Sequence, residues 1–484
     1  MIKFYNTLTN KKEILKPLKD KKIELFVCGP TVYDFSHIGH ARTYIVFDAI
    51  TTYLREIGYD VFYLQNITDI DDKIIKRAKE NNKSPKEIAE RFEKEYYNDM
   101  SLLKVNNVSK YAKATEHIKE IQNQVERLIK KGFAYQIEDG IYYDIKKFKD
   151  YGKLSGRTLI QAEDATSRID NSSKKKNKGD FCLWKISKKN EPKWPFNKLG
   201  IKEGRPGWHI EDTAITEKYF GSQYDIHGGA RDLIFPHHEA EIAQMEAISG
   251  EIPLVKYWLH TGFLTINGQK MAKSLGNFIT IRGFLKKYSA EVLRFFIFSS
   301  HYRSPIDYSE KAIFQAKESL QRLCDFKNKI EQKRQIKKDK NLLNSSLVKK
   351  INKKLEDDFN TPEFFSSLFD IVKKTNRKIN QTGEEKINNI YQLLLFTNKV
   401  FKIFPKEEKE IKKKIQISTS TENIKINITM PESGLSKKIE NIAIEREKCR
   451  YEKNWSRADA LRKQLEQKKI LIEDTPDGPR LKKK

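Results

Sequence analysis

The segment from residue 22 to residue 66 constrains the fold more than any other part of the chain. KKIELFVCG is a short apolar run that stops at Gly29-Pro30, as a buried strand does before a turn. The next segment, HARTYIVFDAITTYLREIGY, has apolar side chains at helical spacing, at Val46, Ile50, Tyr53, Leu54 and Ile57. Gly58 ends this helix, and DVFYLQNI follows as a second strand. A strand, a crossover helix and a second strand predict a parallel sheet that binds a ligand at its carboxyl edge.

The remaining segments differ in character. Residues 68–135 predict charged helices, and 136–200 predict an insertion built from short strands and loops. The sheet pattern resumes at QYDIHGG, and helical patterns fill 309–404. A low-complexity stretch at 406–433 indicates a flexible linker before a compact tail. We therefore expect several domains in this chain of 484 residues.

Composition narrows the class of protein. Lys and Arg number 93 against 66 Asp and Glu, a net charge of +27. This excess predicts a polyanionic partner, nucleic acid before membrane, although a lysine-rich composition gives the same surplus on any solvated surface. The amino terminus has no apolar signal core, and no run approaches 18 apolar residues. With four scattered cysteines and no CxxC pair, these features exclude disulfide scaffolds, secretion and membrane spans, and we expect a cytoplasmic protein.

Two short motifs are candidates for chemistry on phosphate. In PTVYDFSHIGHAR, His37 and His40 flank Gly39 between a strand and a helix, where backbone N–H groups and imidazoles can donate to phosphate oxygens. In GQKMAKSLGN, Lys270 and Lys273 lie on a glycine-flanked loop suited to charge on a leaving phosphate. Each motif alone has an ordinary alternative, a pair of surface histidines or a solvated basic loop.

Together the two motifs are specific. A chain with HIGH after its first predicted strand and KMAKS after its last resembles a class I aminoacyl-tRNA synthetase. CGPTVYD, HIGHAR, NITDIDDKI, GRPGWHIE, YDIHGG, FPHHEAEIAQ and KMAKSLGN resemble the cysteinyl-tRNA synthetase family. The resemblance runs from residue 20 to about residue 310 and continues more loosely to ADALRKQL and ILIEDTPDG in the tail.

The resemblance implies an α/β architecture. It predicts a Rossmann-type catalytic domain with a parallel sheet and an inserted connective domain, followed by an α-helical bundle and a small C-terminal α+β domain. The expected segments are the two catalytic halves (1–115 and 200–265), the connective insertion (116–199), the KMSKS loop and stem-contact region (266–308), the helical bundle (309–405), the flexible linker (406–433) and the anticodon-binding domain (434–484).

The family reaction has two steps. The cysteine carboxylate attacks the α-phosphorus of ATP, which binds with Mg²⁺, and the terminal ribose hydroxyl of tRNA(Cys) then attacks the adenylate. Such chemistry needs positioning and charge stabilisation more than a covalent side chain. The matching catalytic positions are His37, His40, Lys270 and Lys273, and the matching ATP-binding positions are His37, Gly39, His40, Asp232 and Lys273. Ala272 stands where many relatives have Ser.

The family also implies one Zn²⁺ per monomer, which separates cysteine from serine because zinc prefers a thiolate to a neutral hydroxyl. The family ligands are Cys, Cys, His and Glu. Cys28, His237 and Glu241 match three of them, and the last two are four residues apart on a predicted helix. Asp212 stands where the family has its second Cys. Aspartate ligates zinc and has the charge of a thiolate. The alternatives are that Cys28 is only a small buried hydrophobic residue, or that the site has lost its metal.

Further matched positions concern the two other substrates. Cys28, Gly29, Thr68, Trp208 and His227 match the cysteine-binding residues. Candidates for tRNA contact are Trp455, Asp474 and Arg480, and relatives often have an aromatic residue near the position of Leu481. A monomer is expected. The alternatives are a cysteine ligase that acylates an amino sugar, whose members lack the long C-terminal region, and a non-catalytic tRNA-binding paralogue.

Overall fold

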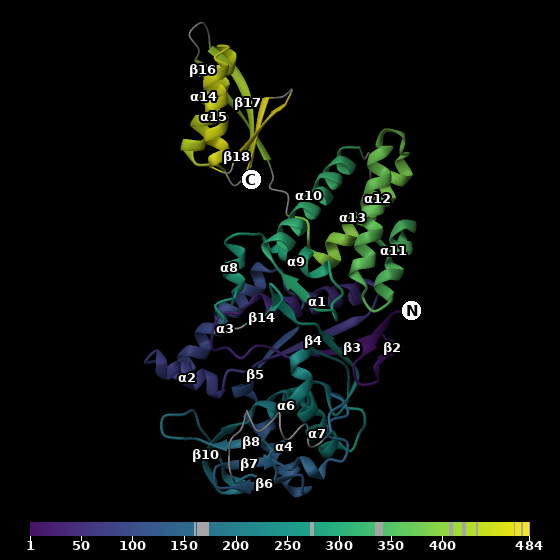
Figure 1. Cartoon of the computed structure of the whole chain (residues 1–484), viewed down its shortest axis with the longest axis vertical. Helices are drawn as coiled ribbons and strands as arrows, with labels where there is room; N and C mark the ends of the chain where they lie inside the picture. Colours follow the sequence, from purple (N-terminus) through teal and green to yellow (C-terminus); the bar gives the residue numbers. More distant parts are fainter. Residues whose placement is uncertain are drawn as a thin grey trace. The chain divides into compact units, whose positions relative to one another are not determined.

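The computed structural model describes residues 1–158, 161, 174–271, 275–333, 342–405, 410–418, 423–431, 434–468, 470–475 and 478–483. The chain forms two compact units, Met1–Phe404 and Pro405–Lys484 (Figure 1). Among the described helices, none is both long and apolar enough to cross a membrane.

A parallel five-stranded sheet lies at the centre of the first unit. Its order is β12-β11-β3-β4-β5, and every neighbouring pair is parallel. The chain adds β4 and β5 on one side of β3 and adds β11 and β12 on the other. The order therefore reverses between β3 and β11, where ligands bind at the carboxyl ends of such strands. The strands are β3 (Lys22–Val27), β4 (Asp60–Ile67), β5 (Lys110–Lys113), β11 (Tyr224–Ala230) and β12 (Val255–Thr261).

Alternation along β3 divides the core. Ile23, Leu25 and Val27 pack in a cluster with α1, α9 and the C-terminal helices of the unit, whereas Phe26 and Cys28 pack with α4, α6 and α7. Figure 1 shows the parallel sheet between these two groups of helices. The helices with these roles are α1 (Ile38–Glu56), α4 (Ile118–Lys130), α6 (Trp208–Phe220), α7 (Glu239–Ser249) and α9 (Ala290–Phe298).

The predicted strand–helix–strand unit is confirmed as β3, α1 and β4, with Gly58 at a positive φ of 99° after the helix. The prediction that 68–135 is helical holds for α2 (Asp72–Glu80), α3 (Pro85–Leu102) and α4, but it misses β5. This strand is only four residues long and contains two lysines, as an edge strand commonly does, so it lacks an apolar signal.

The insertion is an antiparallel sheet of order β6-β7-β8-β10-β9. The strand that comes last along the chain, β10, lies beyond residue 199, where the sequence analysis places the end of the insertion. The strands are β6 (Ala134–Ile137), β7 (Gly140–Tyr143), β8 (Phe181–Ile186), β9 (Trp194–Phe196) and β10 (Ile201–Pro206). Their buried aromatic side chains join the cluster that contains Cys28.

Two small sheets and a helical region complete the first unit. A hairpin turns at Asn267-Gly268 between β13 and β14, and both turn residues have positive φ. The strands are β1 (Lys3–Asn6), β2 (Lys11–Ile14), β13 (Leu264–Ile266), β14 (Gln269–Lys270) and β15 (Ile306–Tyr308). The helices are α8 (Ile281–Leu285), α10 (Glu310–Lys333), α11 (Ser346–Glu356), α12 (Thr361–Arg377) and α13 (Glu384–Phe401).

The second unit corrects the predicted flexible linker at 406–433. Within that range β16 (Glu410–Ser418) and β17 (Asn423–Pro431) form an antiparallel pair that belongs to the sheet β16-β17-β19-β18. The prediction was wrong for these residues because a low-complexity mixture of Lys and Ile conceals a period of two, with Ile428 and Met430 fully buried. The remaining elements are α14 (Lys437–Tyr451), α15 (Trp455–Gln467), β18 (Ile470–Thr475) and β19 (Gly478–Lys483).

Candidate active site and metal centre

The two motif histidines form the amino-terminal cap of α1. The Nδ1 atom of His37 accepts hydrogen bonds from the backbone N–H groups of Gly39 at 3.1 Å and His40 at 3.3 Å. The backbone N–H of His37 donates in return to the His40 ring, and the two rings stack with centroids 3.7 Å apart. A Cβ at Gly39 would lie 2.9 Å from the His37 ring, so a larger residue here would displace the ring that caps the helix. Burial, reinforced by His37 and Lys73, lowers the pKa of His40 well below its ordinary value, and its ring is neutral at pH 7.

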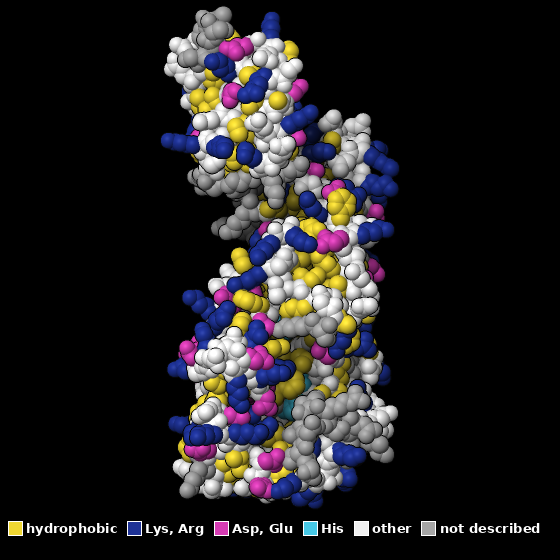
Figure 2. Space-filling view, turned by 60° about the vertical axis from the view of Figure 1, so that its left-hand side comes forward, with side chains coloured by type: hydrophobic (Ala, Val, Ile, Leu, Met, Phe, Trp, Pro, Cys, Tyr) yellow, Lys and Arg dark blue, Asp and Glu magenta, His cyan; other side chains and the backbone are white. Residues whose placement is uncertain are grey.

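The segment after the lysine motif is bonded to the histidine turn. The backbone N–H of Ile38 donates to the carbonyl of Ile279 at 3.1 Å, and the N–H of Ile281 donates to Ser36 at 2.9 Å. Lys270 is exposed on β14, while Lys273 lies outside the described residues. The segment that follows the lysine motif therefore lies against the histidine turn. Figure 2 shows a histidine side chain inside a hollow bordered by hydrophobic side chains, with Lys and Arg on the surface around it.

The four predicted metal ligands converge from separate elements. Cys28 follows β3, Asp212 is on α6, His237 is in the turn Ile234–His238 and Glu241 is on α7. Their ligand atoms all lie within 4.8 Å of one another, and all four residues are buried. The Nε2 atom of His237 is 3.0 Å from Asp212 Oδ2 and 3.1 Å from Glu241 Oε1. One sulfur, one imidazole nitrogen and carboxylate oxygens are donors that zinc accepts.

The charges of this cluster favour a bound cation. Burial, and then the nearby carboxyl groups of Glu241 and Asp212, raises the pKa of the Cys28 thiol well above its ordinary value. Burial followed by Asp212 also raises the pKa of Glu241. In the described part of the chain no Lys or Arg forms an ion pair with these carboxylates, and Asp212 Oδ1 has no hydrogen-bond partner there. A divalent ion would supply the missing positive charge, so the residues present fit a metal.

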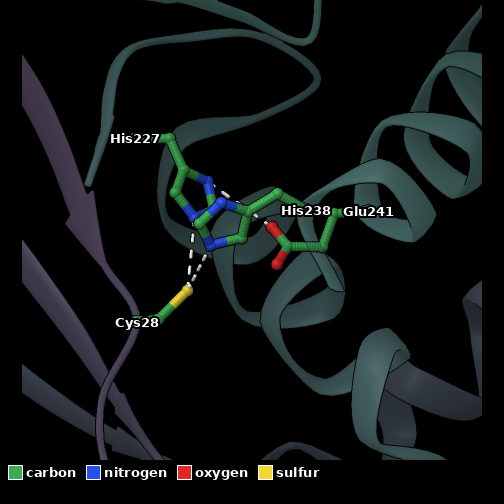
Figure 3. A group of neighbouring side chains, drawn as sticks. All are labelled: Cys28, His227, His238 and Glu241. Carbon is green, nitrogen blue, oxygen red and sulfur yellow. Dashed lines mark hydrogen bonds and ion pairs between the residues drawn. The ribbon is translucent and has the colours of Figure 1, made fainter. Parts of the chain in front are cut away.

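Further histidines surround the cluster, and sequence reasoning missed two of them. Figure 3 shows His227 and His238 directed at Cys28, with Nε2 to Sγ distances of 3.3 Å and 3.1 Å. With Glu241 these residues form a second set of donors within 4.8 Å of one another. His209 Nδ1 lies 2.8 Å from His237 Nδ1. The adjacent histidines of FPHHEAEIAQ were a signal for His238, and WHIE for His209.

Burial keeps the surrounding imidazoles neutral. It lowers the pKa values of His209, His227 and His238 well below the ordinary value, and neighbouring histidines lower them further. Neutral rings keep one unprotonated nitrogen each, which is the form that accepts a proton or binds a metal.

The predicted cysteine contacts lie beside the metal ligands. The backbone N–H of Gly29 donates to Asn66 Oδ1 at 2.5 Å, and a Cβ on Gly29 would lie 1.7 Å from the Asn66 carbonyl oxygen. The half-buried Trp208 ring stacks on His237 with centroids 4.2 Å apart. Thr68 directly follows β4, and Oγ1 of Thr68 donates to a carboxylate of α6. The predicted ribose contact, Asp232, is exposed just after β11.

Comparison with known proteins decides the family. Residues 14–318 match the class I tRNA synthetase (C) catalytic domain, and residues 350–405 match the DALR domain. The chain is 44% identical over 488 residues to the cysteine–tRNA ligase of Methanococcus maripaludis strain C6, covering 98% of each chain. It is 43% identical over 492 residues to the cysteine–tRNA ligase of Thermococcus onnurineus, covering 99% of this chain and 98% of the relative. The chain belongs to the cysteine–tRNA ligase family.

The class I fold of this cysteine–tRNA ligase family member also has distant structural relatives. A Mycobacterium tuberculosis methionyl-tRNA synthetase in complex with methionyl-adenylate superposes with a TM-score of 0.56 at 14% identity, covering 79% of this chain and 90% of that one. The predicted fold class is therefore confirmed, with its parallel sheet, inserted antiparallel sheet, helical region and small C-terminal sheet.

The three tRNA candidates of this ligase lie in the second unit. Trp455 begins α15 and is 58% exposed. Asp474 accepts from Arg446 at 2.7 and 3.0 Å and from Arg450 at 2.5 Å. Arg480 is half-buried on β19, and the neighbouring Leu481 is fully buried in the core of this unit. The Trp455 ring is therefore accessible to solvent.

Proposed function

We propose that this cysteine–tRNA ligase performs both family steps at the carboxyl edge of its parallel sheet. In the first step a carboxylate oxygen of cysteine bonds to the α-phosphorus of ATP, and the bond to pyrophosphate breaks. In the second step a ribose hydroxyl at the 3′ end of tRNA(Cys) bonds to the cysteine carbonyl carbon, and AMP leaves. The observation that carries this proposal is the buried Cys28–Asp212–His237–Glu241 cluster, in a chain with full-length ligase relatives.

The ATP site combines the histidine turn and the lysine loop. His37 and His40, with the backbone at Gly39, hold the phosphates at the amino end of α1, where the helix supplies free N–H groups. Lys270 and Lys273 stabilise charge on the departing pyrophosphate, whose Mg²⁺ arrives with ATP. Asp232 accepts from the ATP ribose. The bonds of residues 36–38 to 279–281 support this arrangement because they join the histidine turn to the segment that closely follows the lysine motif.

The metal site selects the substrate thiol. We assign one Zn²⁺ to Cys28, Asp212, His237 and Glu241, with Asp212 replacing the family's second cysteine at the same charge. When bound, zinc supplies a preference for thiolate over the neutral hydroxyl of serine. A pocket that relied on shape alone would separate such similar side chains only about 10–200-fold. Gly29, Thr68, Trp208 and His227 complete the cysteine site.

The proposal that the chain binds tRNA is supported by its net charge and by residues of the second unit. A net charge of +27 suits a polyanion, and the affinity for tRNA falls steeply as salt rises. Trp455, Asp474 and Arg480 are the proposed contacts for anticodon bases, which are read by stacking and edge hydrogen bonds when single-stranded. The roles of 266–308 in stem contact and of 434–484 in anticodon binding, the monomeric state and the cytoplasmic location remain predictions.

A non-catalytic tRNA-binding paralogue is the alternative. The replacement of the family's cysteine by Asp212 is the one observation in its favour. Against it, the motif residues His37, His40, Lys270 and Lys273 are all present in the sequence, and the four proposed metal ligands converge. An amino-sugar ligase is disfavoured because the chain matches ligase relatives over 98% of their length, including the region after the catalytic domain.

The experiment that tests the function is cysteine-dependent exchange between ATP and pyrophosphate, with serine and no amino acid as controls. We expect exchange with cysteine alone, together with one zinc ion per chain by metal analysis. Exchange with cysteine and serine alike would refute thiol selection at the Asp212 site. Folded protein without exchange would refute the catalytic assignment and favour the paralogue.

A further inference from the structure

Glu211 is a buried acid to which neither the metal site nor the ATP site assigns a role. It lies on α6 directly before Asp212, and its side chain is fully buried. Oε2 accepts a hydrogen bond from Thr68 Oγ1 at 2.9 Å. Oε1 has no hydrogen-bond partner among the residues that the structure describes. A buried carboxylate oxygen without a donor is costly, which indicates that a group absent from the free protein completes it.

A chain of contacts places this carboxylate beside the proposed thiol site. Gly29, next to Cys28, donates its N–H to Asn66 Oδ1 at 2.5 Å, and Asn66 Nδ2 donates to Thr68 Oγ1 at 3.3 Å. Thr68 then donates to Glu211, whose neighbour is Asp212. These hydrogen bonds therefore connect Gly29, which follows the proposed metal ligand Cys28, to Glu211, which precedes the proposed ligand Asp212.

The chemistry of cysteine supplies the missing donor. Its thiol and its ammonium group are on adjacent carbon atoms, so a cysteine whose sulfur lies at the Cys28–Asp212 cluster brings its ammonium group close to the residues that join these ligands. An ammonium group has three N–H donors and a positive charge, which suits an unpartnered buried carboxylate oxygen. From this juxtaposition we infer that Glu211 binds the ammonium group of the substrate cysteine through Oε1, with Thr68 holding Oε2. The inference rests on the cysteine site proposed above.

This role makes Glu211 a specificity-determining residue. The metal site recognises the thiol, and Glu211 recognises the amino group, so a thiol compound without an amino group binds more weakly than cysteine although it fits the metal. Thr68 acts as a positioning residue, because its hydroxyl accepts from Asn66 and donates to Glu211, which fixes the direction of the carboxylate.

The test compares cysteine with 3-mercaptopropionate, which keeps the thiol and the carboxylate but has hydrogen in place of the ammonium group. Binding of both compounds to the zinc-loaded full chain is measured by calorimetry for the wild type, Glu211→Gln and Glu217→Gln. Glu217→Gln is the matched control, because Glu217 is on the same helix, α6, but forms an ion pair with Arg127 at 2.8 Å. Zinc content is measured for each protein.

We expect Glu211→Gln to weaken cysteine binding on the order of 100-fold, because a buried charge pair loses one partner. Binding of 3-mercaptopropionate and the zinc content should be unchanged, and Glu217→Gln should match the wild type. An equal loss for both compounds, a loss of zinc, or no change for cysteine would overturn the inference. Wild-type protein that binds neither compound would instead refute the proposed cysteine site itself.

Discussion

The substitution Asp48→Asn tests how the helix that begins at the histidine motif is held in place. Asp48 is fully buried on α1 and accepts from Arg294 at 3.0 Å and from Lys402 at 2.9 and 3.1 Å. The Arg294 side chain is also fully buried, and its other N–H groups donate to the carbonyls of Phe401 and Leu103. One carboxylate therefore joins α1 to α9 and to the end of α13.

The expected loss of unfolding free energy follows from the burial of Arg294 and Lys402, the two partners of Asp48. Neutralising Asp48 leaves the buried Arg294 and the largely buried Lys402 without their anion, and breaking such a pair costs about 3–5 kcal/mol. Urea unfolding, followed by the fluorescence of Trp184 and Trp258, reports this loss because both rings are fully buried in the first unit.

Two further variants distinguish this explanation from a general effect of substitution. Asp357→Asn is the matched control, because Asp357 is 54% exposed in a surface pair with Lys12 and should change the unfolding free energy by less than about 1 kcal/mol. Replacing Asp48, Arg294 and Lys402 together by Leu, Met and Met should recover part of the loss, since no buried charge remains unpaired. A loss below about 1 kcal/mol for Asp48→Asn would refute the reasoning.

Three other predictions follow from single positions. Gly29→Ala should abolish cysteine-dependent ATP–pyrophosphate exchange and lower stability by about 1–3 kcal/mol or more, because the new Cβ meets the Asn66 carbonyl oxygen; normal exchange would contradict this. Lys273→Ala should lose most adenylate formation with little change in tRNA affinity by filter binding, and comparable losses of both would point to misfolding or failed docking. Burial, then Asp325, raises the pKa of Cys324 to about 11, so iodoacetamide at pH 8 should label this thiol far more slowly than in urea; equal rates would contradict the stated burial.

Local sequence patterns were sufficient to predict the helix and strands near the site. The apolar run at β3, the helical spacing of α1 and Gly58 after it were readable without tertiary information, since each depends on neighbouring residues alone. The strands at 410–418 and 423–431 were missed because lysine-rich repetition resembles a linker until the pairing partner is known. The edge strand β5 was missed for a similar reason, since its short sequence gains its structure from pairing with β4.

The candidate site, too, was only partly predictable from the sequence. The resemblance to a family identified Cys28, Asp212, His237 and Glu241, and the structure brings the four together. Sequence reasoning did not assign His238 a role, since adjacent histidines on one turn look alike until their distances to the Cys28 sulfur are known.

The sequence by itself determined the family and the class of fold, and it predicted the residues that bear the chemistry, because motif spacing is a property of the chain. Only the tertiary structure decided which of these side chains meet. Alternation along β3 turns Cys28 toward α6 and α7, and parallel pairing aligns the ends of β3 and β4. Residues that are 37 and 143 positions apart thereby come within hydrogen-bonding distance, at Gly29–Asn66 and Thr68–Glu211. Burial then removes water from these groups, so an unpartnered oxygen on Glu211 becomes informative only once the fold is known.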